Sequence, residues 1–179
     1  KRLLSLRERL VKQRAGFKAS FKEQKRVLIL NKNKTLFDVQ EKMITYLTKQ
    51  INDVEKQMIT LIKCDDKLKK QYELITSIKG LGMQSTLFII AYTSGFTKFK
   101  NARKFASYIG IAPFPNTSGT SLIGRTKVSH LANKKIKSLL DMCSKSAIQH
   151  NPEMKKYYEK RVAEGKNKMS TLNIIRNKL

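Results

Sequence analysis

Residues 37–68, FDVQEKMITYLTKQINDVEKQMITLIKCDDKL, carry the strongest periodic pattern in the chain. Apolar side chains recur about every 3.5 residues along this stretch, with Gln40 and Asp65 as the polar exceptions. The apolar positions are Phe37, Ile44, Leu47, Ile51, Val54, Met58, Leu61 and Leu68. A repeat sustained over this length predicts a long helix with a seam for a partner helix, and Thr35 is expected to cap its N-terminus.

A basic helix is expected on the N-terminal side of this repeat. Between residues 1 and 28, Leu and Phe side chains follow a spacing of three or four, and Lys and Arg fill most other positions. Two partners for the seam remain open. The first helix could fold back on it as a helical hairpin, or a second copy of the chain could pair with it as a coiled coil.

The pattern changes near residue 73, so two domains are expected, residues 1–72 and residues 73–179. An apolar helix end is followed by Lys79, Gly80, Leu81 and Gly82 and then by another apolar run. This order predicts a helix-hairpin-helix motif over about residues 75–92. The two glycines permit a tight turn, and free N–H groups of the second helix can hold a phosphate. A helical corner without a ligand is the alternative.

The remaining sequence predicts further helices around one irregular loop. A short helix over residues 101–110 precedes residues 112–124, which are predicted as a loop carrying a serine because Pro, Gly, Ser and Thr dominate there. Residues 122–128 could form a short extended piece. Ser129 is expected to cap a long helix that ends before Pro152, and two more helices follow. The predicted fold class is therefore mainly α.

The charge of the chain favours a polyanionic partner, most simply nucleic acid. The sequence has 38 Lys and Arg against 13 Asp and Glu, a net charge of +25. Residues 1–34 carry 12 basic and 2 acidic side chains, residues 35–74 carry 7 of each, and residues 75–179 carry 19 and 4. Since 40% of the residues are hydrophobic, the chain is expected to fold rather than remain disordered.

Composition also limits location and cofactors. No apolar run reaches the roughly 18 residues of a membrane span, and the two distant cysteines fit a reducing cytosol, so a cytoplasmic protein is expected. Two distant cysteines, Cys64 and Cys143, with two histidines predict neither a zinc site nor a disulfide framework. They are expected to pack as ordinary side chains. The chain starts at Lys1, without Met, and is expected to be part of a longer protein.

Carboxylates are scarce in the second domain, where the motifs and basic residues suggest contact with nucleic acid. Between Glu73 and Glu153 the sole acidic residue is Asp141, so no site for metal-dependent nuclease chemistry is expected there. Ser118 and the following Gly119 offer a hydroxyl beside a small residue, which could reach a phosphodiester. The same pair is common in turns, so an ordinary turn serine remains the alternative.

Basic and small residues near these motifs are the candidates for contacts with the phosphate backbone. Cations can neutralise phosphates, and solvated surface charge is the alternative for each. The candidate DNA-binding residues are Lys79, Gly80, Gly82, Arg125, Lys127, Ser129, Lys134 and Lys135.

The order of four segments resembles a known family. They read IKGLG at 78–82, FKNARKFASYIGIAP at 99–113, SG at 118–119 and GRTKVSHLANKKI at 124–136. Together they resemble the C-terminal transposase domain of the IS110 family (IS116/IS110/IS902 type), whose members are DEDD-type transposases and Piv-like invertases. The resemblance covers about residues 73–179. The helices before it resemble the coiled-coil linker of the same family.

The resemblance implies a DNA recombinase with a serine nucleophile. In that family a RuvC-like N-terminal domain binds Mg²⁺ through an acidic tetrad, and a serine of the C-terminal domain forms a covalent link to DNA. Carried over, the nucleophile is Ser118, with Ser121 as the nearest competitor, and His130 receives no role. The resemblance implies no metal site in this chain, which is expected to be inactive alone.

The same resemblance implies a bacterial, nucleoid-associated protein. It also implies DNA, a structured guide RNA and further copies of the chain as partners. Self-association would use the coiled coil. A non-catalytic basic module that binds nucleic acid and oligomerises is the alternative function.

Overall fold

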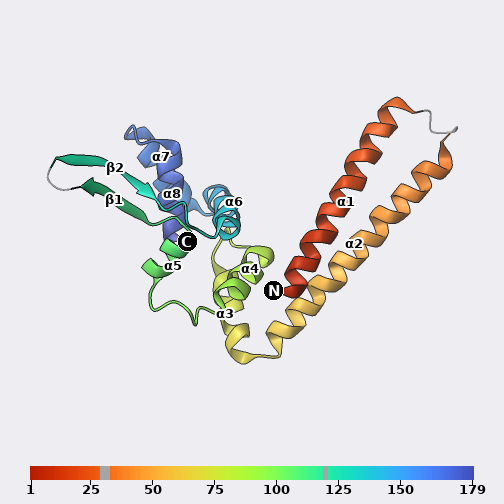
Figure 1. Ribbon diagram of the computed structural model, residues 1–179, viewed down its shortest axis with the longest axis horizontal. Coiled ribbons are helices and arrows are strands. Elements are labelled where there is room, and N and C mark those ends of the chain that lie inside the picture. Colours follow the sequence, from red (N-terminus) through yellow and green to blue (C-terminus); the bar gives the residue numbers. More distant parts are fainter. Residues whose placement is uncertain (29–32, 119–120) are drawn as a thin grey trace. The chain divides into compact units, whose positions relative to one another are not determined.

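The computed structural model describes residues 1–28, 33–118 and 121–179, leaving aside the side chains of Leu122, Ile123 and Arg125. These residues form two compact units, Lys1–Asp66 and Lys67–Leu179 (Figure 1). Both units are helical, and the second also contains a two-stranded sheet. The mainly α prediction is thereby confirmed. In the described part of the chain, no helix is long and apolar enough to cross a membrane.

The first unit is a helical hairpin of α1 (Arg2–Val27) and α2 (Lys34–Lys63). Early residues of α1 contact late residues of α2, since Arg7 Nε donates to Glu55 Oε1 at 2.7 Å. At the opposite end, Gln40 Nε2 donates to Gln24 Oε1 at 2.7 Å. Of the two partners left open by the periodicity, α1 thus packs along the seam of α2. The buried α2 residues are Phe37, Gln40, Leu47, Ile51, Val54, Met58 and Ile62.

Three details of the helix prediction are wrong. The helix ends at Lys63, so Leu68, placed on its seam, lies in the next helix, Asp66–Ser77. Leu61, placed on the seam, is 60% exposed, while Ile62 is 8% exposed. An α-helix with 3.6 residues per turn drifts about 20° per heptad from a 3.5 repeat, so the buried row moves by one position near the end of α2. The expected cap at Thr35 is also wrong, because the helix begins at Lys34 with Asn33 before it.

The core of the second unit lies among three helices and the residues that join them. These are α4 (Met83–Thr93), α5 (Ala102–Tyr108) and α6 (Lys134–His150), preceded by α3 (Asp66–Ser77), and the turn between α3 and α4 contributes Leu81. Buried Cys143 belongs to the same core, whereas Cys64 is exposed. The core residues are Leu81, Ile89, Ile109, Ile111, Ile136, Leu140 and Cys143.

The division between the units falls six residues before the change in sequence pattern near residue 73. The reason is that α3 contacts the second unit with its first turns. Gln71 Nε2 donates to Gly95 O at 2.9 Å, and a Cβ added at Gly95 would lie 3.3 Å from Leu68.

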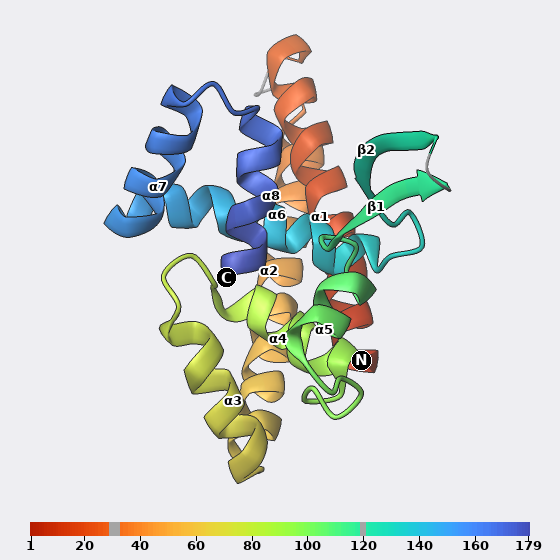
Figure 2. The ribbon, with the colours of Figure 1, turned by 90° about the vertical axis from the view of Figure 1, so that its left-hand side faces the viewer.

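Helices α6, α7 (Pro152–Ala163) and α8 (Lys168–Lys178) pack together at the C-terminal end of the chain (Figure 2). Each begins after an asparagine whose side chain accepts hydrogen bonds from first-turn N–H groups: Asn133, Asn151 and Asn167. Ser129 was the expected cap of α6. That expectation is wrong, because Ser129 Oγ accepts from Leu131 N within the preceding turn.

The segment predicted as an irregular loop contains a strand. β1 (Pro113–Ser118) pairs antiparallel with β2 (Leu122–Val128), so the expected extended piece over 122–128 is confirmed and the loop over 113–118 is wrong. All six residues of β1 are exposed. The strand therefore lacks the alternation of apolar and polar residues by which a half-buried strand is recognised, and its two prolines favoured a loop instead.

Candidate nucleic-acid interface

The β hairpin carries Ser118 at the end of β1. Ser118 is exposed and pairs with Leu122 in the register of the two strands. Ser121 is also exposed, in the turn before β2. Gly119, the second residue of the candidate pair, lies outside the described residues. The structure therefore presents both candidate hydroxyl residues at the same end of the hairpin.

A bulge and a close backbone contact shape the hairpin near this end. The register shifts between Phe114 and Asn116, so one residue of β1, Pro115, faces two residues of β2. Proline fits there because it has no N–H to offer a ladder. A Cβ added at Gly124 would lie 2.6 Å from Asn116 Nδ2 and 3.0 Å from Asn116 O, so a side chain at Gly124 would push the strands apart.

The base of the hairpin is fixed to two helices. Before β1, Ile111 O accepts from Asn173 Nδ2 at 3.0 Å and from Asn177 Nδ2 at 3.1 Å, both on α8. After β2, Asn133 N donates to Tyr108 O of α5 at 2.9 Å, and Asn133 Nδ2 donates to the Tyr108 hydroxyl at 2.9 Å. Gly110 (φ +71°) allows Ala132 to approach its backbone closely, because a Cβ at Gly110 would lie 2.4 Å from the Cβ of Ala132.

The first group of candidate residues lies in the turn between α3 and α4. Lys79 is exposed. Gly80 has φ +110°, and a Cβ there would lie 2.8 Å from the Cβ of Ala147 in α6. Packing against α6 thus accounts for this glycine without any ligand. Gly82 precedes α4 and has open space around its Cα.

Cys143 lies against the start of α4 and shows how the turn is held. Its Sγ and Ser85 Oγ are 3.0 Å apart. Burial raises the pKa of the Cys143 thiol, against the opposing influence of Ser85 and of the Gly82 N–H. The residue is a neutral packing group, as the sequence predicted for it.

The second group of candidate residues lies at the N-terminal end of α6, opposite the end near Ala147 that Gly80 contacts. Lys134 and Lys135 occupy the first turn of the helix, and both are exposed. Lys135 Nζ lies 5.4 Å from the centroid of the Phe88 ring. Lys127 is exposed near the end of β2, and Ser129 is the first residue after β2. The side chain of Arg125 is not described.

The two groups do not form one compact patch. At 1.5 Å per residue, the length of helix from Lys134 to Ala147 is about 20 Å. Gly80 contacts the Ala147 end, so Lys79 lies far along the helix from Lys134 and Lys135. Any single nucleic acid that touches both groups must extend along α6.

A cavity at the base of the hairpin contains functional candidates that sequence reasoning missed. Its volume is about 580 Å³, and its lining includes Lys127, His130, Lys137, Met169, Asn173 and Arg176. Only Lys127 among these was a candidate from the sequence. The others come from three separated segments, and no local spacing relates them.

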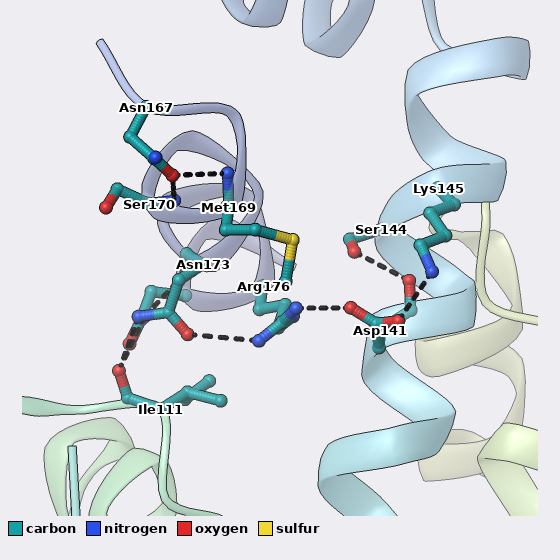
Figure 3. Close-up of polar contacts among 10 residues, drawn as sticks. Ile111, Asp141, Ser144, Lys145, Asn167, Met169, Ser170, Asn173 and Arg176 are labelled. Carbon is teal, nitrogen blue, oxygen red and sulfur yellow. Dashed lines mark hydrogen bonds and ion pairs between the residues drawn. The ribbon is translucent and has the colours of Figure 1, made fainter.

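An ion cluster lies beside this cavity (Figure 3). Arg176, 8% exposed, pairs with Asp141 of α6, which also pairs with Lys145 Nζ at 2.8 Å. Burial by itself would raise the pKa of Asp141, but hydrogen bonds and charges from Lys145 and Arg176 outweigh it and lower the pKa below the ordinary value. Asp141 therefore serves as an ionised structural partner of two cations.

No group of three or more His, Cys, Asp or Glu side chains that could hold a metal ion occurs within the described ranges. With Asp141 already engaged by two cations, these residues do not fit a Mg²⁺ site.

Comparison with known proteins gives one family and several relatives. Residues 72–159 match the sequence model described as Transposase IS116/IS110/IS902 family. The pilin gene-inverting protein of Moraxella lacunata is 25% identical over 137 residues, covering 76% of this chain and 42% of that protein. The insertion element IS110 uncharacterized 43.6 kDa protein of Streptomyces coelicolor is 28% identical over 93 residues, covering 52% of this chain and 23% of that protein.

The match to the Moraxella protein extends beyond the family segment, since it covers three quarters of the chain. The chain spans less than half the length of these curated relatives. Over residues 72–159 its sequence is similar to the IS116/IS110/IS902 transposase family, the family that the order of its motifs indicates.

Proposed function

We propose that this chain is part of a DNA recombinase and supplies Ser118 as the nucleophile for strand cleavage and rejoining. One observation carries the proposal. Ser118 ends a strand at the exposed far end of a hairpin, inside the segment that matches a transposase family. The pilin gene-inverting protein is named for the inversion of a gene. The same class of reaction is proposed for the protein to which this chain belongs.

The chemistry follows from the residue type. The Ser118 oxygen attacks phosphorus, a bond from serine to phosphorus forms, and the bond to the leaving DNA oxygen breaks. The hydroxyl proton passes to a base, and the leaving oxygen is protonated. Because the phosphodiester is exchanged rather than hydrolysed, the reverse step can join a new DNA end.

The hairpin sequence suits this role because it carries no negative side chain that would repel a phosphate. Residues 113–128 contain Arg125 and Lys127 and no carboxylate. Cations near the transferring phosphoryl group stabilise the charge that develops on it. The family resemblance implies that Mg²⁺ is held by an acidic domain of the longer protein.

The test is Ser118→Ala in the full-length recombinase, with Ser121→Ala as the matched control. We expect Ser118→Ala to reduce excision and circle formation by at least about 10³-fold, as for loss of a nucleophile, and Ser121→Ala to change them little. A denaturing gel should show a covalent protein–DNA adduct with the parent protein and not with Ser118→Ala. Unimpaired recombination by Ser118→Ala would exclude the assignment.

We also propose that the helical hairpin mediates self-association. With its seam facing α1, α2 exposes a second apolar row, formed by Leu36, Val39, Met43 and Tyr46 at 37–58% exposure. Their spacing of three, four and three residues places them on one face of the helix. The non-catalytic alternative, a basic binding and oligomerisation module, shares this feature but predicts no covalent adduct.

Sedimentation of the whole chain tests this second proposal. We expect Val39→Lys with Tyr46→Lys to shift the chain from oligomer to monomer at micromolar concentration. The matched control is Asn52→Lys, which adds a charge at an exposed position on a different face of α2. A parent chain that is monomeric throughout would contradict self-association. Guide RNA remains a proposal from the resemblance alone.

A further inference from the structure

The cavity beside the base of the β hairpin is built mainly from cations and neutral groups. It lies among β2, the segment after it, α6 and α8, and its volume of about 580 Å³ is within the range of small-ligand sites. Lys127 comes from β2, and Lys137 comes from α6. No carboxylate lines it in the part of the chain that the structure describes.

A buried guanidinium forms part of the wall. Arg176 Nη2 donates to Asp141, and Nη1 donates to Asn173 Oδ1 at 3.4 Å (Figure 3). Its Nε finds no hydrogen-bond partner among the described residues, which is uncommon for a side chain only 8% exposed. The wall of the cavity therefore includes a buried cation with an unsatisfied N–H donor.

The one carboxylate nearby does not cancel the positive charge of the cavity. Asp141 pairs with both Arg176 and Lys145, so this cluster of three keeps one net positive charge. Lys127 and Lys137 add two more. An anionic ligand is therefore favoured over a neutral or cationic one.

The other part of the lining is apolar. Met169 is 64% exposed although its side chain is large and hydrophobic, and it lines the cavity together with Val128 and Ile174. A polarisable thioether at such a surface makes favourable contacts with aromatic rings. A nucleotide combines an anion with a flat aromatic group and so matches both parts of the lining.

We propose that this cavity binds one nucleotide of a single DNA strand, with its phosphate near Lys127 and Lys137 and its base against Met169. The proposal rests on the proposed function for its substrate class. A duplex keeps its bases stacked inside, so an unpaired strand is needed to place a base on Met169.

The position of the cavity relative to Ser118 fits one continuous strand. Pro113 lines the cavity, and β1 extends from Pro113 to Ser118, a length of about 17 Å. One strand of B-form DNA carries one phosphate for about every 3.4 Å of helix axis. A strand held in the cavity can therefore place a phosphodiester a few nucleotides away at the serine.

The test measures binding of a fluorescent 12-nucleotide single-stranded DNA to the whole chain. The variants are Lys137→Gln and Met169→Ser. The matched controls lie outside the cavity: Lys156→Gln, an exposed lysine of α7, and Met142→Ser, which has the same 64% exposure as Met169. We expect each cavity variant to weaken binding about three- to tenfold and each control to change it less than about twofold.

Two further measurements identify the bound groups. Lys137→Gln should reduce the slope of log K against log salt by about 0.7, the value for one phosphate of a single strand, and Lys156→Gln should not. Met169→Ser should leave binding of an abasic 12-mer unchanged, because no base is present to lose. Equal effects of Met169→Ser and Met142→Ser on the normal 12-mer, or an equal loss with duplex DNA, would overturn the proposal. A greater loss with RNA of the same sequence would overturn the assignment to DNA.

The outcome is separable from that of the nucleophile. Ser118→Ala should bind the 12-mer as the parent chain does, within about twofold. If Ser118→Ala retains recombination while the cavity variants lose binding, the serine assignment fails and the nucleotide subsite stands. If the cavity variants bind normally while Ser118→Ala abolishes the adduct, the subsite fails alone.

Discussion

The α1–α2 hairpin and the β1–β2 hairpin are both antiparallel pairs of consecutive elements, but different interactions stabilise them. The helical pair buries a row of seven α2 side chains, whereas all six residues of β1 are exposed. The β hairpin depends on its base, where two asparagines of α8 hold Ile111. The buried seam stabilises the helical hairpin, whereas attachment at its base alone leaves the β hairpin exposed to a ligand.

Removing a seam side chain should produce the largest change in stability. Ile51 of α2 is 3% exposed, and Ile51→Ala deletes buried carbons and leaves a cavity, which costs about 2–5 kcal/mol. Urea unfolding followed by circular dichroism at 222 nm measures this cost. Thr117→Ala in exposed β1 is the control and should change the unfolding free energy by less than about 0.5 kcal/mol. Similar losses in both variants would contradict the difference between the hairpins.

Breaking the ion pair beside α8 should have an intermediate effect. Asp141→Asn leaves the buried Arg176 without its carboxylate, and we expect a loss of about 2–3 kcal/mol at pH 7, at the low end for buried pairs because Asp141 is partly exposed. Lys155→Gln, which removes an exposed ion pair of α7 with a 4.0 Å separation, is the control and should cost little.

The pH dependence of the same pair gives a second check. The folded-state pKa of Asp141 is lowered, so its contribution is present above the unfolded value of about 3.9 and is lost as pH falls through the lower folded value. The parent chain should therefore lose more stability than Asp141→Asn between about pH 5 and pH 2. Parallel stability profiles for the two proteins would show that the pair does not contribute.

A change within the β hairpin should have the smallest global effect. Gly124→Ala places a Cβ 2.6 Å from Asn116 Nδ2 and 3.0 Å from Asn116 O, so the strands must separate locally. We expect less than about 0.5 kcal/mol in global unfolding and faster hydrogen exchange of hairpin amides. The second variant Gly124→Ala with Asn116→Gly should recover part of the protection, because it removes the obstructing amide. Unchanged exchange in Gly124→Ala would mean that the close contact is unimportant.

The sequence predictions were more accurate for the helical hairpin than for the β hairpin. The long helix α2 and its seam were predictable because burial of one face imposes a period, although α1 and a second copy of the chain both remained possible partners. The error of Leu61 instead of Ile62 reflects the difference between 3.5 and 3.6 residues per turn. The strand β1 was not predictable because no face of it is buried. Exposure removes the constraint that would have marked it.

The candidate site was predictable only in part. Short motifs indicated Ser118 and the cations around it, and the structure places Lys127, Lys134 and Lys135 toward one end of α6 and Lys79 toward the other. The cavity was missed because its walls come from distant segments. Arg176 and Asp141, for example, are separated by 35 positions, and no local spacing can indicate such a pair.

The asparagines that begin α6, α7 and α8 have a consequence for the chemical ageing of this protein. Each amide oxygen accepts N–H groups of its helix, and an aspartate of nearly the same shape would do so equally well. Hydrolysis of the side-chain amide to aspartate makes that replacement and adds one negative charge. A molecule changed in this way is therefore expected to keep its helices while its attraction for phosphate declines, so that loss of binding precedes any loss of fold.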